Sequence, residues 1–143
     1  MFALANIERQ TMQAQAFDSP LVQGSWYQVE VRESGIYKLD QKFFTDAGIS
    51  MSSIGNINSI RIYGNGGKEL PENLNTARPN GLEEIARHVV DNNLNGLFDS
   101  NDYIVFYGRS TRGWNYSPSS KTFDHYINHY SEQNYYFLTF GGV

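Results

Sequence analysis

The chain has 143 residues, a formal net charge of −4, an aromatic content of 15% and no cysteine. The lack of cysteine excludes disulfides, thiolate metal sites and a cysteine nucleophile within these residues. No stripe of basic residues marks a nucleic-acid surface, and no apolar run approaches the roughly twenty residues that a membrane-spanning helix needs. We therefore expect neither nucleic-acid binding nor membrane insertion.

The first part of the chain differs in composition from the rest. Residues 1–20 are polar and glutamine-rich, and they lack the charged start and apolar block of a signal peptide. We expect them to be a flexible lead-in or a segment added ahead of the domain. Residues 21–143 are long enough for one domain with a core of its own. They end at Gly141-Gly142-Val143, directly after a strand-like run, so we predict a fragment of a longer protein.

The first predicted elements are two strands and a short helix. Residues 25–31 alternate two sets of side chains, and residues 35–39 follow after a Glu33-Ser34-Gly35 turn, a pattern that favours a β-hairpin. Asp40 has the place of a helix N-cap, because its carboxylate can accept from free backbone N–H groups. Gly48 has the place of a C-cap, so we predict a helix over residues 41–47.

The remaining strands are predicted, from their β-branched and aromatic composition, at residues 57–63, 83–90, 102–107, 122–126 and 134–140. Residues 64–67 form a glycine-rich turn, and residues 69–80 and 108–122 are predicted to be loops. About seven short strands with one small helix indicate a mainly β fold. We predict a single β-sandwich or jelly-roll-like domain with one short helix at about 41–47.

Residues 91–102 have the spacing of a calcium-binding loop. Six positions of the loop offer oxygen ligands at the intervals that calcium loops use, and they are Asp91, Asn93, Asn95, Leu97, Asp99 and Asp102. Leu97 would contribute its backbone carbonyl, and the other five would contribute side-chain oxygens. Gly96 stands at the sharp turn of the loop. The three carboxylates repel one another unless a cation is present. We predict a structural calcium ion here, with Leu97 or Phe98 anchoring the loop inward.

Two features limit this interpretation. The twelfth position is an aspartate rather than the longer glutamate that chelates with both oxygens, which predicts weak affinity or competition by magnesium. The flanking segments are predicted strands, so the loop is a clamp rather than a helix–loop–helix sensor. The alternative is an Asn/Asp/Gly-rich turn without metal, although hairpin loops usually have only about two to five residues.

Other candidate sites are weaker. Trp114 and Tyr116 could stack on a sugar ring, together with Trp26, Tyr126 and Tyr130, but aromatics also fill ordinary β cores. A second group, Asp124, His125 and His129, could ligate metal or act as a base only if the chain bends. Residues 108–110 lack the pattern of a nucleophile elbow, and residues 64–67 lack the Lys-Ser/Thr of a phosphate loop.

Four stretches in order carry a resemblance, namely GSWYQVEVRESGIYKLDQKFF, SIRIYGNGGKELPE, LFDSNDYIVFYGRSTRGWNY and FDHYINHYSEQNYYFLTFGG. Together they resemble the N-terminal region of the gingipain-like cysteine peptidases of Bacteroidetes, above all the PorU-type sortases of the type IX secretion system and related secreted peptidases. The resemblance covers roughly residues 24–142. The catalytic His and Cys of that family lie in a later domain, and no residue here corresponds to them.

The resemblance implies a non-catalytic accessory module in a secreted, outer-membrane or cell-surface protein. Its expected partner is the downstream peptidase domain of the same chain, with other secretion-system or cell-surface proteins as further candidates. The alternative is a calcium-stabilised carbohydrate-binding module that uses Trp114 and Tyr116. A glycan array with a Trp114→Ala control separates the two hypotheses.

Overall fold

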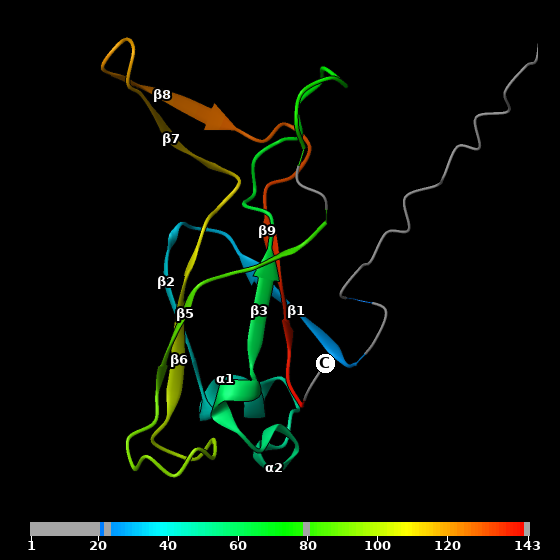
Figure 1. Cartoon of the computed structure of the whole chain (residues 1–143), viewed down its shortest axis with the longest axis vertical. Coiled ribbons are helices and arrows are strands. Elements are labelled where there is room, and N and C mark those ends of the chain that lie inside the picture. Colours follow the sequence, from blue (N-terminus) through cyan, green and yellow to red (C-terminus); the bar gives the residue numbers. More distant parts are fainter. Residues whose placement is uncertain (1–20, 22–23, 79–80, 142–143) are drawn as a thin grey trace, which may run out of the picture.

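Two antiparallel sheets face each other, and a two-stranded ribbon extends from one end of them (Figure 1). This computed structural model describes residues 21, 24–78 and 81–141, so the expectation for residues 1–20 lies outside the described residues. The first sheet has the order β1-β9-β3-β4, and its strands are β1 (Trp26–Val31), β9 (Asn134–Thr139), β3 (Arg61–Gly64) and β4 (Glu83–Glu84).

The second sheet has the order β2-β6-β5, and its strands are β2 (Gly35–Asp40), β6 (Tyr103–Gly108) and β5 (Arg87–Val90). The ribbon pairs β7 (Arg112–Ser117) with β8 (Thr122–Ile127). The mainly β, sandwich-like fold class predicted from the sequence is confirmed.

The core lies between the two sheets because each sheet turns alternate apolar side chains inward. Val31 and Leu138 come from the first sheet, Leu39 and Ile104 come from the second, and all four are buried. An aromatic contact joins the layers, since the rings of Phe106 on β6 and Tyr136 on β9 pack edge to face at 5.3 Å. The remaining buried hydrophobic residues complete this one cluster.

Short helical segments close one end of the sandwich. They are α1 (Gln41–Asp46), α2 (Met51–Ile54) and the 3-10 turn η2 (Ile57–Ser59). The predicted N-cap is confirmed, because Asp40 Oδ1 accepts from the backbone N–H of Phe43 at 3.1 Å. Phe44 of α1 is fully buried and fixes the helix on the core.

Four predicted elements were wrong, and one of them is the predicted strand 83–90, which is divided into β4 of the first sheet and β5 of the second. Residues 25–31 and 35–39 do not form a hairpin, because β1 pairs with β9 and β2 pairs with β6, so the chain crosses between the sheets at residues 32–34. The predicted strand 57–63 begins with η2 and is extended only from Arg61. The predicted loop 108–122 contains β7, and α2 was not predicted.

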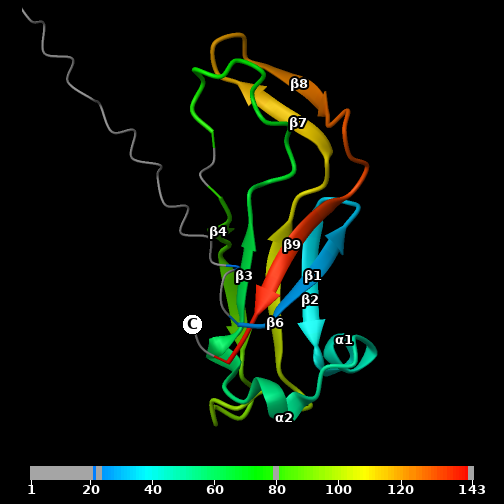
Figure 2. The ribbon, with the colours of Figure 1, turned by 90° about the vertical axis from the view of Figure 1, so that its right-hand side faces the viewer.

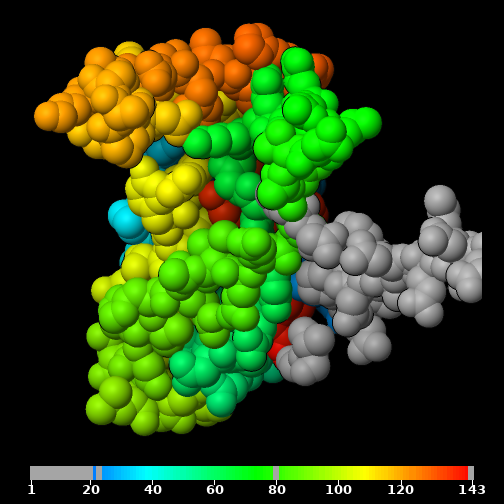
Figure 3. Space-filling view, turned by 45° about the horizontal axis from the view of Figure 1, so that its top comes forward, coloured from blue at the N-terminus to red at the C-terminus, as the bar shows by residue number. Residues whose placement is uncertain are grey.

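The two ends of the molecule differ in character. The β7–β8 hairpin stands at one end, and the 91–102 loop lies beside the helices at the other (Figure 2). In the space-filling view, the hairpin and the 65–78 segment together form a lobe above a hollowed waist (Figure 3). A hollow of about 430 Å³ beneath the hairpin is lined by residues that include Lys68, Tyr107 and Arg109.

Candidate functional sites

The 91–102 loop connects β5 to β6, as the flanking strands predicted. Its turn is shaped by Gly96, which has a φ of 75° in the left-handed region that glycine adopts without a steric penalty. Asp91 fixes this turn, since its Oδ2 accepts from the Gly96 N–H at 2.8 Å. Two further side chains cap turns in the same way: Asn93 Oδ1 accepts from Asn95 N, and Asn95 Oδ1 accepts from Leu97 N.

Asp102 closes the loop from inside. Its side chain is almost fully buried, with 1% of the residue exposed. One carboxylate oxygen accepts from the backbone N–H of Asn92 at 2.9 Å, and the other accepts from that of Asp99 at 3.0 Å. A buried carboxylate needs such partners because its desolvation is costly. Asp102 therefore joins the two ends of the loop.

Asp99 is held by amide groups of the loop itself. Asn93 Nδ2 donates to its Oδ2 at 2.5 Å, and Asn95 Nδ2 donates to the same oxygen at 3.2 Å. The hydrogen bond from Asn93 is the largest cause that holds the pKa of Asp99 below its ordinary value of 3.8. The carboxylate is therefore ionised at neutral pH.

One oxygen of the predicted ligand set has no hydrogen-bond partner. Asp91 Oδ1 is buried and accepts no hydrogen bond, although the other oxygen of the same carboxylate is satisfied. Unpartnered buried oxygens are uncommon in proteins and call for a physical reason. Within the described residues, no group of three or more histidine or acidic side chains converges in a geometry that could hold a metal ion. Calcium binding by this loop therefore stays a prediction.

The loop is anchored by Phe98 rather than by Leu97. Phe98 is buried and packs edge to face on Phe44 of α1 at 5.2 Å, whereas Leu97 is exposed. A short bridge strengthens the anchor, because Phe98 N donates to Gly55 O at 2.8 Å and Ile57 N donates to Gly96 O at 3.1 Å. The loop thus connects the second sheet to the helical end of the first.

The second candidate, Trp114 and Tyr116, lies on the β7–β8 hairpin. Both side chains project from the same face of β7, since alternate residues of a strand share a face. Their cross-strand partners are His125 and Phe123, with ring centroids 4.8 Å and 5.2 Å apart. Phe123 was not predicted as a member of this group, although pairing of residues 112–117 with 122–127 places it beside Tyr116.

The other proposed stacking residues lie elsewhere. Trp26 packs edge to face on Tyr63 of the first sheet at 5.2 Å. Tyr126 lies on the opposite face of the hairpin, where the Lys68 ammonium sits 5.1 Å from its ring centre. Tyr130 is exposed in the loop that follows β8. The five aromatics therefore do not form one platform.

The residues considered for acid–base chemistry are separated. Asp124 and His125 are neighbours on β8 and so point to opposite faces. His129 pairs with Glu69, whose Oε1 lies 2.8 Å from Nδ1. Ser110 is buried and donates to Arg112 O at 2.8 Å, which is a structural hydrogen bond.

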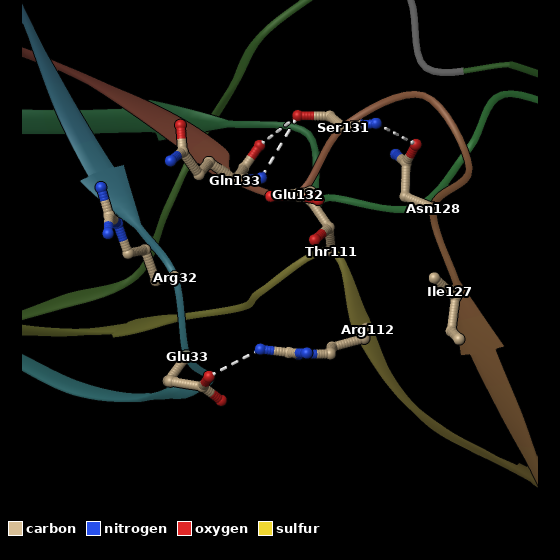
Figure 4. A pocket seen from close by; sticks show the side chains of 9 residues that line it. All are labelled: Arg32, Glu33, Thr111, Arg112, Ile127, Asn128, Ser131, Glu132 and Gln133. Carbon is tan, nitrogen blue, oxygen red and sulfur yellow. Dashed lines mark hydrogen bonds and ion pairs between the residues drawn. The ribbon is translucent and has the colours of Figure 1, made fainter.

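A pocket of about 410 Å³ lies where the base of the hairpin meets the sandwich (Figure 4). Its two guanidinium groups have carboxylate partners, because Arg112 pairs with Glu33 at 2.9 Å and Arg32 pairs with Glu30. Their positive charge is therefore neutralised locally. Ser131 on the far wall donates to Gln133 O at 2.7 Å and stabilises its own turn.

One comparison with known proteins found a similar fold. No family model matches the sequence, and no curated protein matches it. Among solved structures, the fold is similar to part of the crystal structure of dimeric latent PorU from Porphyromonas gingivalis, with a TM-score of 0.57 and 28% sequence identity. The match covers 85% of this chain and 10% of the PorU chain.

The chain is thus similar to a PorU-like domain that spans about a tenth of the length of that protein. Within the described residues, no helix is long and apolar enough to cross a membrane.

Proposed function

We propose that this chain is a non-catalytic accessory domain of a secreted gingipain-like cysteine peptidase or type IX secretion sortase. The observation that carries the proposal is the match to PorU, which combines 28% identity with a shared fold over 85% of this chain. The match covers only a tenth of the PorU chain, so the similar region is one part of a much larger molecule. A cell-surface or secreted location follows from the same proposal.

The role of the domain is to pack on the peptidase domain of the same polypeptide and to support its folding or limit access to it. This role is better supported than that of an independent enzyme, because the candidate acid–base residues Asp124, His125 and His129 do not lie together. Contacts with other secretion-system or cell-surface proteins belong to the same proposal.

Hydrogen–deuterium exchange tests the packing. The amide exchange of residues 21–141 is measured in this chain and in the longer polypeptide that contains the peptidase domain. Packing predicts that one continuous surface exchanges more slowly in the longer polypeptide. Identical exchange over the whole domain would remove the support for an accessory role.

The 91–102 loop is proposed to hold a structural calcium ion. Three observations support this: the ligand spacing, the buried and unpartnered Asp91 Oδ1, and the Asp99 carboxylate, which is ionised at neutral pH. Asn93 and Asn95 would turn their amide oxygens toward the ion and give up their present bonds to Asp99. The ion would join strands β5 and β6 more firmly and leave the fold unchanged.

Isothermal titration with calcium, in protein first treated with a chelator, tests this site. We expect heat from a single site and a rise in thermal stability through mass action. The variant Asp91→Ala should lose both, while Asp124→Ala, which removes an exposed carboxylate outside the loop, should keep both. Absence of heat and of a thermal shift in the unsubstituted protein would show that the loop is a turn without metal.

Carbohydrate binding is the alternative function, and the shared exposed face of Trp114 and Tyr116 favours it. Aromatic faces bind sugar rings by stacking. A glycan array with Trp114→Ala as the control tests the alternative. Binding that disappears in the variant would support it, and no binding across the array would leave the accessory domain as the proposed function.

A further inference from the structure

The exposed face of the β7–β8 hairpin concentrates large apolar side chains in one place. The cross-strand register puts six residues on this face, and four of them are apolar and more than half exposed: Trp114 (66%), Tyr116 (54%), Phe123 (65%) and Ile127 (53%). The opposite face is more polar and lies toward the 65–69 segment, where Lys68 contacts Asn115 and Tyr126. The hairpin is therefore amphipathic, with its apolar face toward solvent.

An uncovered apolar ribbon is unusual on physical grounds. A two-stranded hairpin is marginally stable in water unless a further strand or another element packs on it. Here the two strands pair only with each other, and the ribbon stands away from both sheets (Figure 1). Clustered exposed apolar residues of this kind typically mark an interaction surface.

The hairpin is also held in a fixed position, as a docking surface needs to be. At its base, the backbone N–H of Asn128 donates to Thr111 O at 2.8 Å, and the Asn128 amide donates to Gly67 O. On the other side, Arg112 pairs with Glu33 of the β1–β2 corner at 2.9 Å. Preorganisation of this kind lowers the entropic cost of association.

We propose that this apolar face of the hairpin is the surface by which the domain docks on another domain of the same polypeptide, and this inference rests on the proposed accessory function. The size of the face identifies the occupant. Large aromatic side chains bury about 150–250 Å² each, so the three aromatics of this face, each somewhat more than half exposed, together with the half-exposed Ile127, offer about 400 Å². Separate molecules need about 800 Å² on each partner for a stable complex. Contacts between domains of one chain bury about 600–1,500 Å² in total. A face of about 400 Å² on each side gives a total within this range.

Tethering makes the small interface sufficient, because a linked partner is present at a high effective concentration. A sugar ligand fits the geometry less well. The Trp114 ring is tilted by 57° to His125, and the Tyr116 ring is tilted by 50° to Phe123, so the face is not a flat stacking platform. A ridged aromatic face is instead suited to interdigitate with the side chains of a protein partner.

A matched pair of cysteine variants tests the proposal. His125→Cys puts a thiol on the apolar face, and Asp124→Cys puts one on the opposite face of the same strand. Both positions are exposed, and the chain has no cysteine of its own, so the thiol is unique in this chain, and peptide masses distinguish it from any cysteine of the longer polypeptide. Modification by a maleimide is followed by peptide mass spectrometry in this chain and in the longer polypeptide.

We expect the thiol at position 125 to react at least about tenfold more slowly in the longer polypeptide than in this chain, and the thiol at position 124 to react alike in both. Amide exchange over residues 112–127 in the unsubstituted protein is a second measure and should slow in the same comparison. Equal reactivity at position 125 in both proteins, with unchanged exchange over 112–127, would overturn the proposal.

The outcomes also separate this inference from the proposed function. Slower exchange on some other surface of the domain would leave the accessory role standing and refute the hairpin as the docking site. Protection of position 125 that depends on the concentration of this chain alone would identify a second copy as the occupant. Protection by a glycan would identify a sugar. Either of these results would also overturn the proposal.

Discussion

Asp102 offers the sharpest test of the 91–102 loop as an internally bonded clamp. Its two carboxylate oxygens each accept one backbone N–H, from Asn92 and from Asp99, and the residue is 1% exposed. Asp102→Ala removes two hydrogen bonds to a charged group, each worth about 1.5–3 kcal/mol. The donors are only part-buried, so we expect a loss at the lower end, about 3 kcal/mol. Asp102→Asn keeps one acceptor oxygen and should cost about half as much.

Urea unfolding followed by circular dichroism, with a chelator present, measures these losses without any contribution from metal. With a denaturant dependence of about 2 kcal/mol per molar urea, the midpoint should fall by about 1.5 M for Asp102→Ala and about 0.7 M for Asp102→Asn. Asp124→Ala is the control, because that residue is exposed on β8. A midpoint within about 0.3 M of the unsubstituted protein for Asp102→Ala would refute the role assigned to this carboxylate.

Three further predictions concern other parts of the fold. The hydrogen bond from the backbone N–H of Phe43 holds the pKa of Asp40 below its ordinary 3.8. The contribution of the Asp40 carboxylate to stability is therefore present above pH 3.8 and is lost as the pH falls through the lowered pKa. Asp40→Asn, also a good cap, should lose less stability in acid than the unsubstituted protein, and Asp40→Ala should lose about 1 kcal/mol of stability at pH 7. Gly67→Ala should lower the free energy of unfolding by about 2–3 kcal/mol, and Gly66→Ala should lower it by about 1 kcal/mol. Both glycines have positive φ, but only at Gly67 would the new methyl group lie 2.8 Å from a backbone oxygen. Equal losses in chemical unfolding would contradict this close approach. Phe98→Ala should lose about 3–5 kcal/mol in thermal unfolding, because Phe98 is buried against the helical end, and a loss below about 1 kcal/mol would show that it does not anchor the loop.

Local features of the fold could be predicted from the sequence. The Asp40 cap and the β1 alternation depend on neighbours within a few residues, and both are present in the structure. Strand pairing could not be predicted in this way. The Glu33-Ser34-Gly35 turn suggested a hairpin, but the partner of β1 is β9 at the other end of the chain. That pairing depends on packing between distant segments, which the local pattern does not contain.

The missed strand β7 has a related cause. Trp114 and Tyr116 alternate with Gly113 and Asn115, residues that are depleted in strands. Gly113 is explained by its environment, since a Cβ there would lie 2.8 Å from the hydroxyl of Tyr126 across the hairpin. Only the cross-strand partner shows why glycine occupies that position.

The candidate metal loop was predicted in part. The spacing of the loop predicted the turn at Gly96 and an inward anchor at Leu97 or Phe98; the turn is present, and Phe98 is the buried residue of the two. It did not predict that the amides of Asn93 and Asn95 bond to Asp99, or that Asp102 satisfies two backbone donors. These bonds depend on side-chain rotamers that the order of the residues does not determine.

Coupled unfolding in the longer polypeptide tests the accessory role most directly. Ile104→Ala removes a fully buried core side chain and should destabilise this domain by about 2–5 kcal/mol, whereas Leu94→Ala changes an exposed one and should have little effect. If the domain packs on the peptidase domain and supports it, Ile104→Ala should also lower the unfolding midpoint of the peptidase domain. A peptidase midpoint that stays unchanged, while this domain unfolds earlier, would contradict the accessory role.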